Sequence, residues 1–157
     1  MIKKTLTLLF ITISSIVYTQ NENALKWETK LDQAINKAVS ENKTMMLFFT
    51  GSDWCGWCMR LQKEVFVKPE FKNWADKNVV LVELDFPRRT AQDPKISQQN
   101  RELAQMFQVR GYPTVWFVEP EISDSNQINL KKIGYQGYLA GGPVAWTTSA
   151  NKFLLNK

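Results

Sequence analysis

The only two cysteines of the chain, Cys55 and Cys58, are separated by two residues and lie between a predicted strand and a predicted helix. The strand is the continuous apolar run from Thr44 to Thr50, as expected of a buried central strand, and a helical pattern follows from Met59 to Val67. Two thiols at this spacing can close a disulfide, and the second can attack a mixed disulfide formed by the first. This feature constrains both the fold and the chemistry.

A helix start favours a negatively charged sulfur, because unpaired backbone N–H groups and the positive end of the helix dipole face it. A thiol in that position is the better nucleophile. We therefore predict that Cys55 is the attacking sulfur and that Cys58, inside the first turn and less exposed, is the resolving sulfur. Trp54 and Trp57 are predicted to shield the pair and to offer a flat apolar surface to a flexible substrate.

A structural disulfide and a metal site are the alternatives for such a pair. A disulfide between Cys55 and Cys58 restricts very little chain, so its entropic contribution is small. A zinc site needs about four ligands. Because the chain has two cysteines and no histidine, only a site shared between molecules remains. The sequence thus favours a redox-active pair without metal or cofactor, and it excludes catalytic groups that need histidine.

The remaining periodicity predicts an α/β domain in which strands alternate with helices. A helical face runs through Ala24 to Asn42, with Thr29 as the expected N-cap, and a short strand is considered before it, around Leu25 to Trp27. Further strands are predicted at Val79 to Asp85, Val115 to Val118 and Leu130 to Tyr138, and further helices at Glu70 to Lys77, Ile96 to Val109 and Pro143 to Leu155. Because helices separate the first three strands, we expect these strands to be parallel, and we expect the last two strands to form a hairpin.

The first 19 residues read as a secretory signal peptide. Lys3 and Lys4 precede an apolar stretch from Leu6 to Val17, which is shorter than the ~20 residues of a membrane-spanning helix. An uncleaved N-terminal anchor is the alternative. In both cases we expect the domain, residues 20–157, to work outside the cytoplasm, in the periplasm or secreted.

The charge of the chain does not indicate a nucleic-acid partner. The formal net charge is +5, of which Lys3 and Lys4 contribute two, and no basic run is longer than a pair. We read this mild excess as a solubility feature and expect a monomer.

In its motifs the chain resembles the thioredoxin superfamily. The segment from Phe48 to Cys58 is similar to the strand, loop and W-C-x-x-C site of that family, and Gly111 to Thr114 is similar to its Gly-x-Pro-Thr loop. The order of elements also matches from about residue 25 to the end. Among exported bacterial members, the soluble C-terminal domain of DsbD is similar. The resemblance implies a thioredoxin-like α/β fold with a central mixed sheet of four to five strands flanked by helices.

The resemblance also implies an activity and roles for individual residues. The protein would be a thiol–disulfide oxidoreductase with Cys55 as nucleophile and Cys58 as resolver, and its redox group would be this pair rather than a cofactor. Pro113 would be a cis proline that places the backbone of Tyr112 against a bound peptide. Its substrates would be exported proteins with disulfides, and a membrane thiol transporter would supply the electrons.

One position departs from the family pattern. Many thioredoxins carry a buried Asp six residues before the first cysteine, where it helps to deprotonate the resolving thiol, and this chain has Phe49 there. Glu64, Glu83 and Asp85 are the candidates to replace that acid.

The residues between the cysteines, Gly56 and Trp57, carry no charge that would stabilise a thiolate, which favours a reductase over an oxidant. A peptide-binding or folding-assistance module with incidental thiols and a domain with a permanent disulfide are the alternatives.

Overall fold

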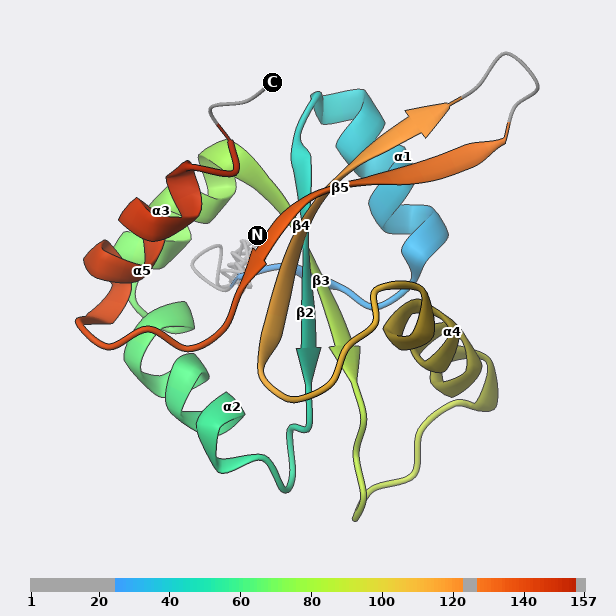
Figure 1. Cartoon of the computed structure of the whole chain (residues 1–157), viewed down its shortest axis with the longest axis horizontal. Helices are drawn as coiled ribbons and strands as arrows, with labels where there is room; N and C mark the ends of the chain where they lie inside the picture. Colours follow the sequence, from blue (N-terminus) through green and yellow to red (C-terminus); the bar gives the residue numbers. More distant parts are fainter. Residues whose placement is uncertain (1–24, 123–126, 155–157) are drawn as a thin grey trace, which may run out of the picture.

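The computed structural model describes residues 25–122 and 127–154, so the predicted signal peptide lies outside the described residues. A twisted five-stranded sheet forms the middle of the molecule, with helices on both faces (Figure 1). One face is covered by α2, α3 and α5, and the other by α1 and α4. Within the described residues, no helix is both long and apolar enough to span a membrane.

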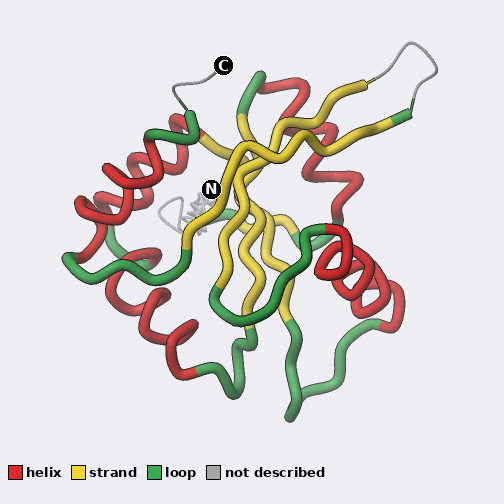
Figure 2. Tube along the Cα trace, viewed as in Figure 1, coloured by secondary structure: helices red, strands yellow, loops and turns green. Residues whose placement is uncertain are grey.

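The order of elements confirms the predicted thioredoxin-like α/β class. The strands are β1 (Trp27–Glu28), β2 (Thr44–Thr50), β3 (Val79–Asp85), β4 (Thr114–Ile122) and β5 (Ile128–Gln136). The helices are α1 (Leu31–Glu41), α2 (Gly56–Leu61), the π-helical turn η1 (Gln62–Phe66), α3 (Pro69–Asn78), α4 (Pro94–Met106) and α5 (Gly142–Asn151). In Figure 2 the strands, coloured yellow, run through the middle of the fold between the red helices.

The directions of the strands correct one prediction. The sheet order is β1-β3-β2-β4-β5, and β1 and β2 run parallel to β3, but β4 is antiparallel to β2 and forms the predicted hairpin with β5. Thr114 pairs with Phe49, so β4 begins beside the end of β2. The segment of residues 86–113 therefore leaves and re-enters the sheet at the same end of the strands. Alternation of strands and helices does not reveal whether a helix returns the chain to the opposite end of the sheet, which is why the sequence suggested three parallel strands.

The start of α1 also differs from the prediction. The helix begins at Leu31, Lys30 holds the N-cap position without a side-chain cap, and Thr29 lies outside it. The Leu31 N–H instead donates to Oε1 of Gln99 at 2.9 Å, and Nε2 of Gln99 donates to the Thr29 carbonyl at 3.0 Å. A side chain of α4 thus satisfies the backbone at this helix start, and no local pattern around Thr29 could have predicted it.

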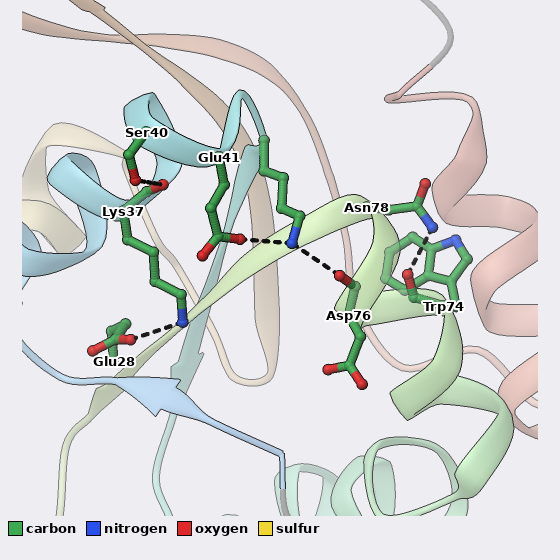
Figure 3. A network of polar contacts seen from close by, with 8 residues as sticks. Glu28, Lys37, Ser40, Glu41, Trp74, Asp76 and Asn78 are labelled. Atoms are coloured by element: carbon green, nitrogen blue, oxygen red, sulfur yellow. Dashed lines mark hydrogen bonds and ion pairs between the residues drawn. The ribbon is translucent and has the colours of Figure 1, made fainter.

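Polar contacts tie the C-terminal half of α1 to neighbouring elements (Figure 3). Lys37 pairs with Glu28 of β1 at 3.0 Å. Nζ of Lys43, just after α1, contacts Oε2 of Glu41 at 2.6 Å and the carbonyl of Asp76 in α3 at 2.9 Å. The hydrogen bond from Lys43 lowers the pKa of Glu41. Such partly exposed pairs contribute little stability, but they fix how α1 meets β1 and α3.

Aromatic packing supports the helices on the cysteine side of the sheet. Trp146 of α5 is fully buried and meets Phe66 and Phe71 edge-on, at 5.3 and 5.7 Å between ring centroids. Its Nε1 donates to the carbonyl of Gly137 at 3.0 Å, so its one polar atom has a partner. This cluster joins α5 to η1 and α3, and Cys55 and Cys58 belong to the same cluster of buried residues.

Candidate active site

Cys55 and Cys58 form a disulfide where the chain passes from β2 into α2. Cys55 is the N-cap residue of α2, and its Sγ accepts a hydrogen bond from the Cys58 N–H at 3.2 Å. The two residues are 6% and 1% exposed, so Cys55 is the less buried of the two. Both are more covered than the sequence suggested for an accessible nucleophile, because Trp54, Tyr112 and Tyr138 pack against the same cluster.

The loop before Cys55 is fastened to the loop after β3. Nε1 of Trp54 donates to the carbonyl of Phe86 at 2.7 Å. The carboxylate of Asp53 accepts hydrogen bonds from the backbone N–H groups of residues 88–90 at 2.7 to 3.2 Å. These donors, led by the N–H of Arg88, favour the charged form and lower the pKa of Asp53. The sequence reasoning did not assign this anchoring role to Asp53, because its partners lie 35 to 37 residues away.

The loop before β4 reaches the same end of the sheet. The peptide bond between Tyr112 and Pro113 is cis, and the ring of Tyr112 stands edge-on to Trp54 at 5.7 Å and lies 5.3 Å from Phe86. Burial raises the pKa of Tyr112, and the charge of Arg88 opposes this rise. The structure thus brings two of the predicted contact residues, Trp54 and Tyr112, together beside Cys55.

Trp57, in α2, contacts Tyr138 from the segment after β5. It is 55% exposed and packs against Tyr138 at 5.3 Å. The Arg60 guanidinium lies 5.3 and 5.1 Å from these two rings. Glu64 accepts hydrogen bonds from the Tyr138 hydroxyl at 2.5 Å and from Nε of Arg60 at 2.8 Å, which lower the pKa of Glu64. Sequence reasoning did not assign Tyr138 or Arg60 to the site, since nothing local places Tyr138 near the cysteines.

The three candidate acids occupy different surroundings. Glu64 is engaged with Tyr138 and Arg60, and Asp85 accepts hydrogen bonds from the N–H and hydroxyl of Ser52 at 2.8 and 2.6 Å. Glu83 instead lines a cavity of about 440 Å³ together with Cys58. Burial and the nearby charge of Asp85 raise the pKa of Glu83. Among residues 25–122 and 127–154, the carboxyl of Glu83 has no hydrogen-bond or ion-pair partner.

Phe49, which stands where many thioredoxins carry a buried Asp, lies on the face of the sheet away from the cysteines. Phe49 packs on the α4 side of the sheet, against Phe107 at 6.0 Å, and so faces away from the cysteines. Its neighbour Phe48 lies in the cluster that contains Cys55 and Cys58. Because side chains alternate along a strand, Phe48 and not Phe49 has its side chain on the cysteine side of β2. Counting six residues back from Cys55 therefore selected the wrong face.

No metal centre is built from the residues that the structure describes: they contain no group of three or more His, Cys, Asp or Glu side chains able to hold an ion.

Comparisons with known proteins agree with this geometry. The model of the thioredoxin-like domain matches residues 31–127. The chain is 32% identical over 130 residues to the disulfide bond reductase DsbH of Chlamydia pneumoniae, which covers 83% of this chain and 73% of DsbH. A solved structure described as DsbH oxidoreductase superposes with a TM-score of 0.72 at 29% identity and covers 93% of this chain and 96% of its own.

The predicted similarity to the DsbD domain is confirmed at the level of the fold. The oxidised C-terminal domain of Neisseria meningitidis DsbD superposes with a TM-score of 0.51 at 18% identity, over 82% of this chain and 98% of that domain.

We predict that Asp53→Asn loosens residues 88–90, because the amide loses the charge that attracts three backbone N–H groups. Hydrogen exchange followed by NMR should show faster exchange of these amides than in the parent, while the amides of β2 keep their protection. In the parent, this protection should persist above the ordinary Asp pKa of 3.8 and be lost as the pH falls through the lowered pKa of folded Asp53. Unchanged exchange in Asp53→Asn would contradict the assigned role.

Proposed function

Since the chain belongs to the family of thioredoxin-like domains and is a thiol–disulfide oxidoreductase, we propose that it reduces disulfide bonds in exported proteins. The observation that carries this proposal is the Cys55–Cys58 disulfide at the start of α2. One sulfur caps the helix and the other lies inside its first turn. Their surroundings differ, which supports different roles for the two thiols.

In the proposed reaction, the Cys55 thiolate attacks one sulfur of the substrate disulfide, and the substrate's S–S bond breaks. The other substrate sulfur leaves as a thiolate and takes up a proton, while the substrate stays joined to Cys55 in a mixed disulfide. Cys58 then loses its proton and attacks Cys55 Sγ, which releases the second substrate sulfur as a thiolate that is protonated in turn. The substrate gains two electrons and two protons, and the protein ends with its own disulfide.

The surroundings of the pair support the reducing direction. Gly56 and Trp57 carry no charge that would stabilise the Cys55 thiolate. The nearest following cation, Arg60, is held by Glu64 at 2.8 Å and lies over the rings of Trp57 and Tyr138. The relative DsbH is itself named a disulfide bond reductase. A reductase that works outside the cytoplasm needs electrons from inside, so the partner on that side is a membrane thiol transporter.

We expect a reduction potential close to that of thioredoxin, about −270 mV, and far from that of DsbA, about −120 mV. Equilibration in buffers of reduced and oxidised glutathione, followed by quantification of free thiols after alkylation, measures it. Gly56→Lys should raise the potential, because a cation next to Cys55 stabilises the thiolate. A parent potential near −120 mV would refute the reducing direction.

The location and the surface used for substrates complete the proposal. Residues 1–19 act as a signal peptide and residues 20–157 as the domain that works in the periplasm, where disulfides form. Trp54, Trp57, Tyr112 and Pro113 contact the substrate. The exposed ring of Trp57 supports this assignment, as does the contact between Trp54 and Tyr112 beside Cys55.

We predict that Cys58→Ser accumulates covalent mixed disulfides with exported proteins, because Cys55 attacks but nothing resolves the product. Non-reducing gels followed by mass spectrometry identify the trapped partners. Cys55→Ser is the matched control and should trap far fewer. If the variant with both Cys55→Ser and Cys58→Ser reduces insulin as fast as the parent, the thiols are incidental and the protein is a folding-assistance module.

We further propose that Glu83 accepts the proton of Cys58 during resolution. Cys58 is 1% exposed, so its thiol needs a nearby acceptor. Glu83 lines the same cavity, has a raised pKa, and is not committed to another side chain among the described residues. The cavity, at about 440 Å³, has room for water to relay the proton. Under this proposal, Glu83 on β3 accepts the proton of the resolving thiol, whereas many thioredoxins use an Asp six residues before the first cysteine.

We expect Glu83→Gln to slow the release of a mixed disulfide by roughly a hundredfold, the lower end of the range for losing a positioned proton acceptor. Stopped-flow measurement of thiol release from a preformed Cys55 adduct isolates this step. In the parent, the rate should fall as the pH drops through the raised pKa of Glu83, because the protonated carboxyl no longer accepts. Glu102→Gln on exposed α4 is the control. An identical pH profile in Glu83→Gln would exclude this role.

A further inference from the structure

Arg88 places a positive charge at the rim of the site, and no carboxylate of the described residues pairs with it. Its guanidinium carbon lies 3.7 Å from the ring centroid of Trp54, a close stacking contact, and its charge acts on the Tyr112 hydroxyl. Trp54 directly precedes Cys55, and Tyr112 directly precedes the cis proline. Arg88 therefore lies among the residues that are proposed to contact the substrate, although it comes from the loop after β3.

The nearby carboxylates are already engaged with other groups. Asp53 accepts hydrogen bonds from the backbone N–H groups of residues 88–90 and from the hydroxyl of Thr90. Asp85 accepts from the backbone and hydroxyl of Ser52. In the part of the chain that the structure describes, the guanidinium of Arg88 has no carboxylate within ion-pair distance. Its planar fork of donors remains free while the ring of Trp54 holds one face.

The position of this charge is fixed by backbone contacts. The N–H of Arg88 donates to Asp53 at 3.0 Å, and the neighbouring Phe86 carbonyl accepts from Trp54 at 2.7 Å. The loop that carries the guanidinium is therefore anchored to the loop that carries Cys55. A pre-positioned cation loses less conformational freedom when it pairs with a ligand than a freely rotating one does.

We propose that Arg88 recognises an acidic side chain beside the cysteine of a substrate disulfide, so that the protein prefers disulfides flanked by Asp or Glu. This inference rests on the proposed function and names the substrate class of the same site. When the substrate sulfur approaches Cys55, the residues next to it pass over Trp54 and Tyr112. A carboxylate there meets the free donors of Arg88 and gains two charge-assisted hydrogen bonds.

The test uses two disulfide peptides that differ only in the residue before the cysteine, Glu in one and Gln in the other. The rate constant for their reduction by the pre-reduced protein is measured for the parent, for Arg88→Gln and for Arg88→Glu. Arg89→Gln is the matched control, because its neighbouring charge has no contact with Trp54 among those the structure records. All variants keep the backbone N–H groups that bind Asp53.

We expect the parent to favour the Glu peptide by about two- to fivefold at low salt, the range for one exposed charge pair. Arg88→Gln should bring this ratio close to one, Arg88→Glu should invert it, and Arg89→Gln should retain it. High salt should lower the ratio of the parent, since the pair is solvent-exposed. A ratio near one in the parent would overturn the proposal. So would an equal decrease of the rate constants for both peptides in Arg88→Gln. Failure of the parent to reduce either peptide would instead count against the proposed function.

Discussion

The whole site depends on how β2 is held in the sheet. All seven residues of this strand are buried, and it pairs with β3 on one side and with β4 on the other. A strand fixed along both edges also fixes the point at which the chain leaves the sheet. Cys55 follows Thr50 by five residues and caps the next helix, so the end of β2 sets where its sulfur lies. The position of the reactive sulfurs therefore depends on how β2 is held in the sheet.

The two sides of the cysteine pair differ in character. On one side, the loops before Cys55 and after β3 are joined through Asp53 and Trp54, and Arg88 adds a positive charge over the Trp54 ring. On the other side, the ring of Trp57 is exposed, and the charge of Arg60 is tied to Glu64. Under the proposed function, a peptide bound across the pair would meet a cation at one end and an apolar ring at the other. Such asymmetry would favour one direction of binding over the reverse.

The sequence was sufficient to predict the features that are encoded locally. The apolar run of β2, the C-x-x-C spacing and the helical pattern after it identified the strand, the pair and α2. Three features were not predictable, because each depends on contacts between distant segments. The side chain of Gln99 completes the start of α1, the backbone N–H groups of residues 88–90 bind Asp53, and β4 re-enters the sheet at the end of the strands from which the chain had left. The sequence showed that no acid stands six residues before Cys55, but a count along the chain does not determine which face of a strand Phe49 occupies.

The two outer strands of the sheet affect how the protein behaves among partly unfolded chains. β1 is only two residues long, and β5 carries Lys131 and Lys132 along an edge that pairs with β4 across an irregularity at Phe117 and Val118. Short or charged edges resist pairing with a foreign strand. A protein that meets extended polypeptides repeatedly can thus exchange electrons with them at the cysteine pair without templating their aggregation along its own borders.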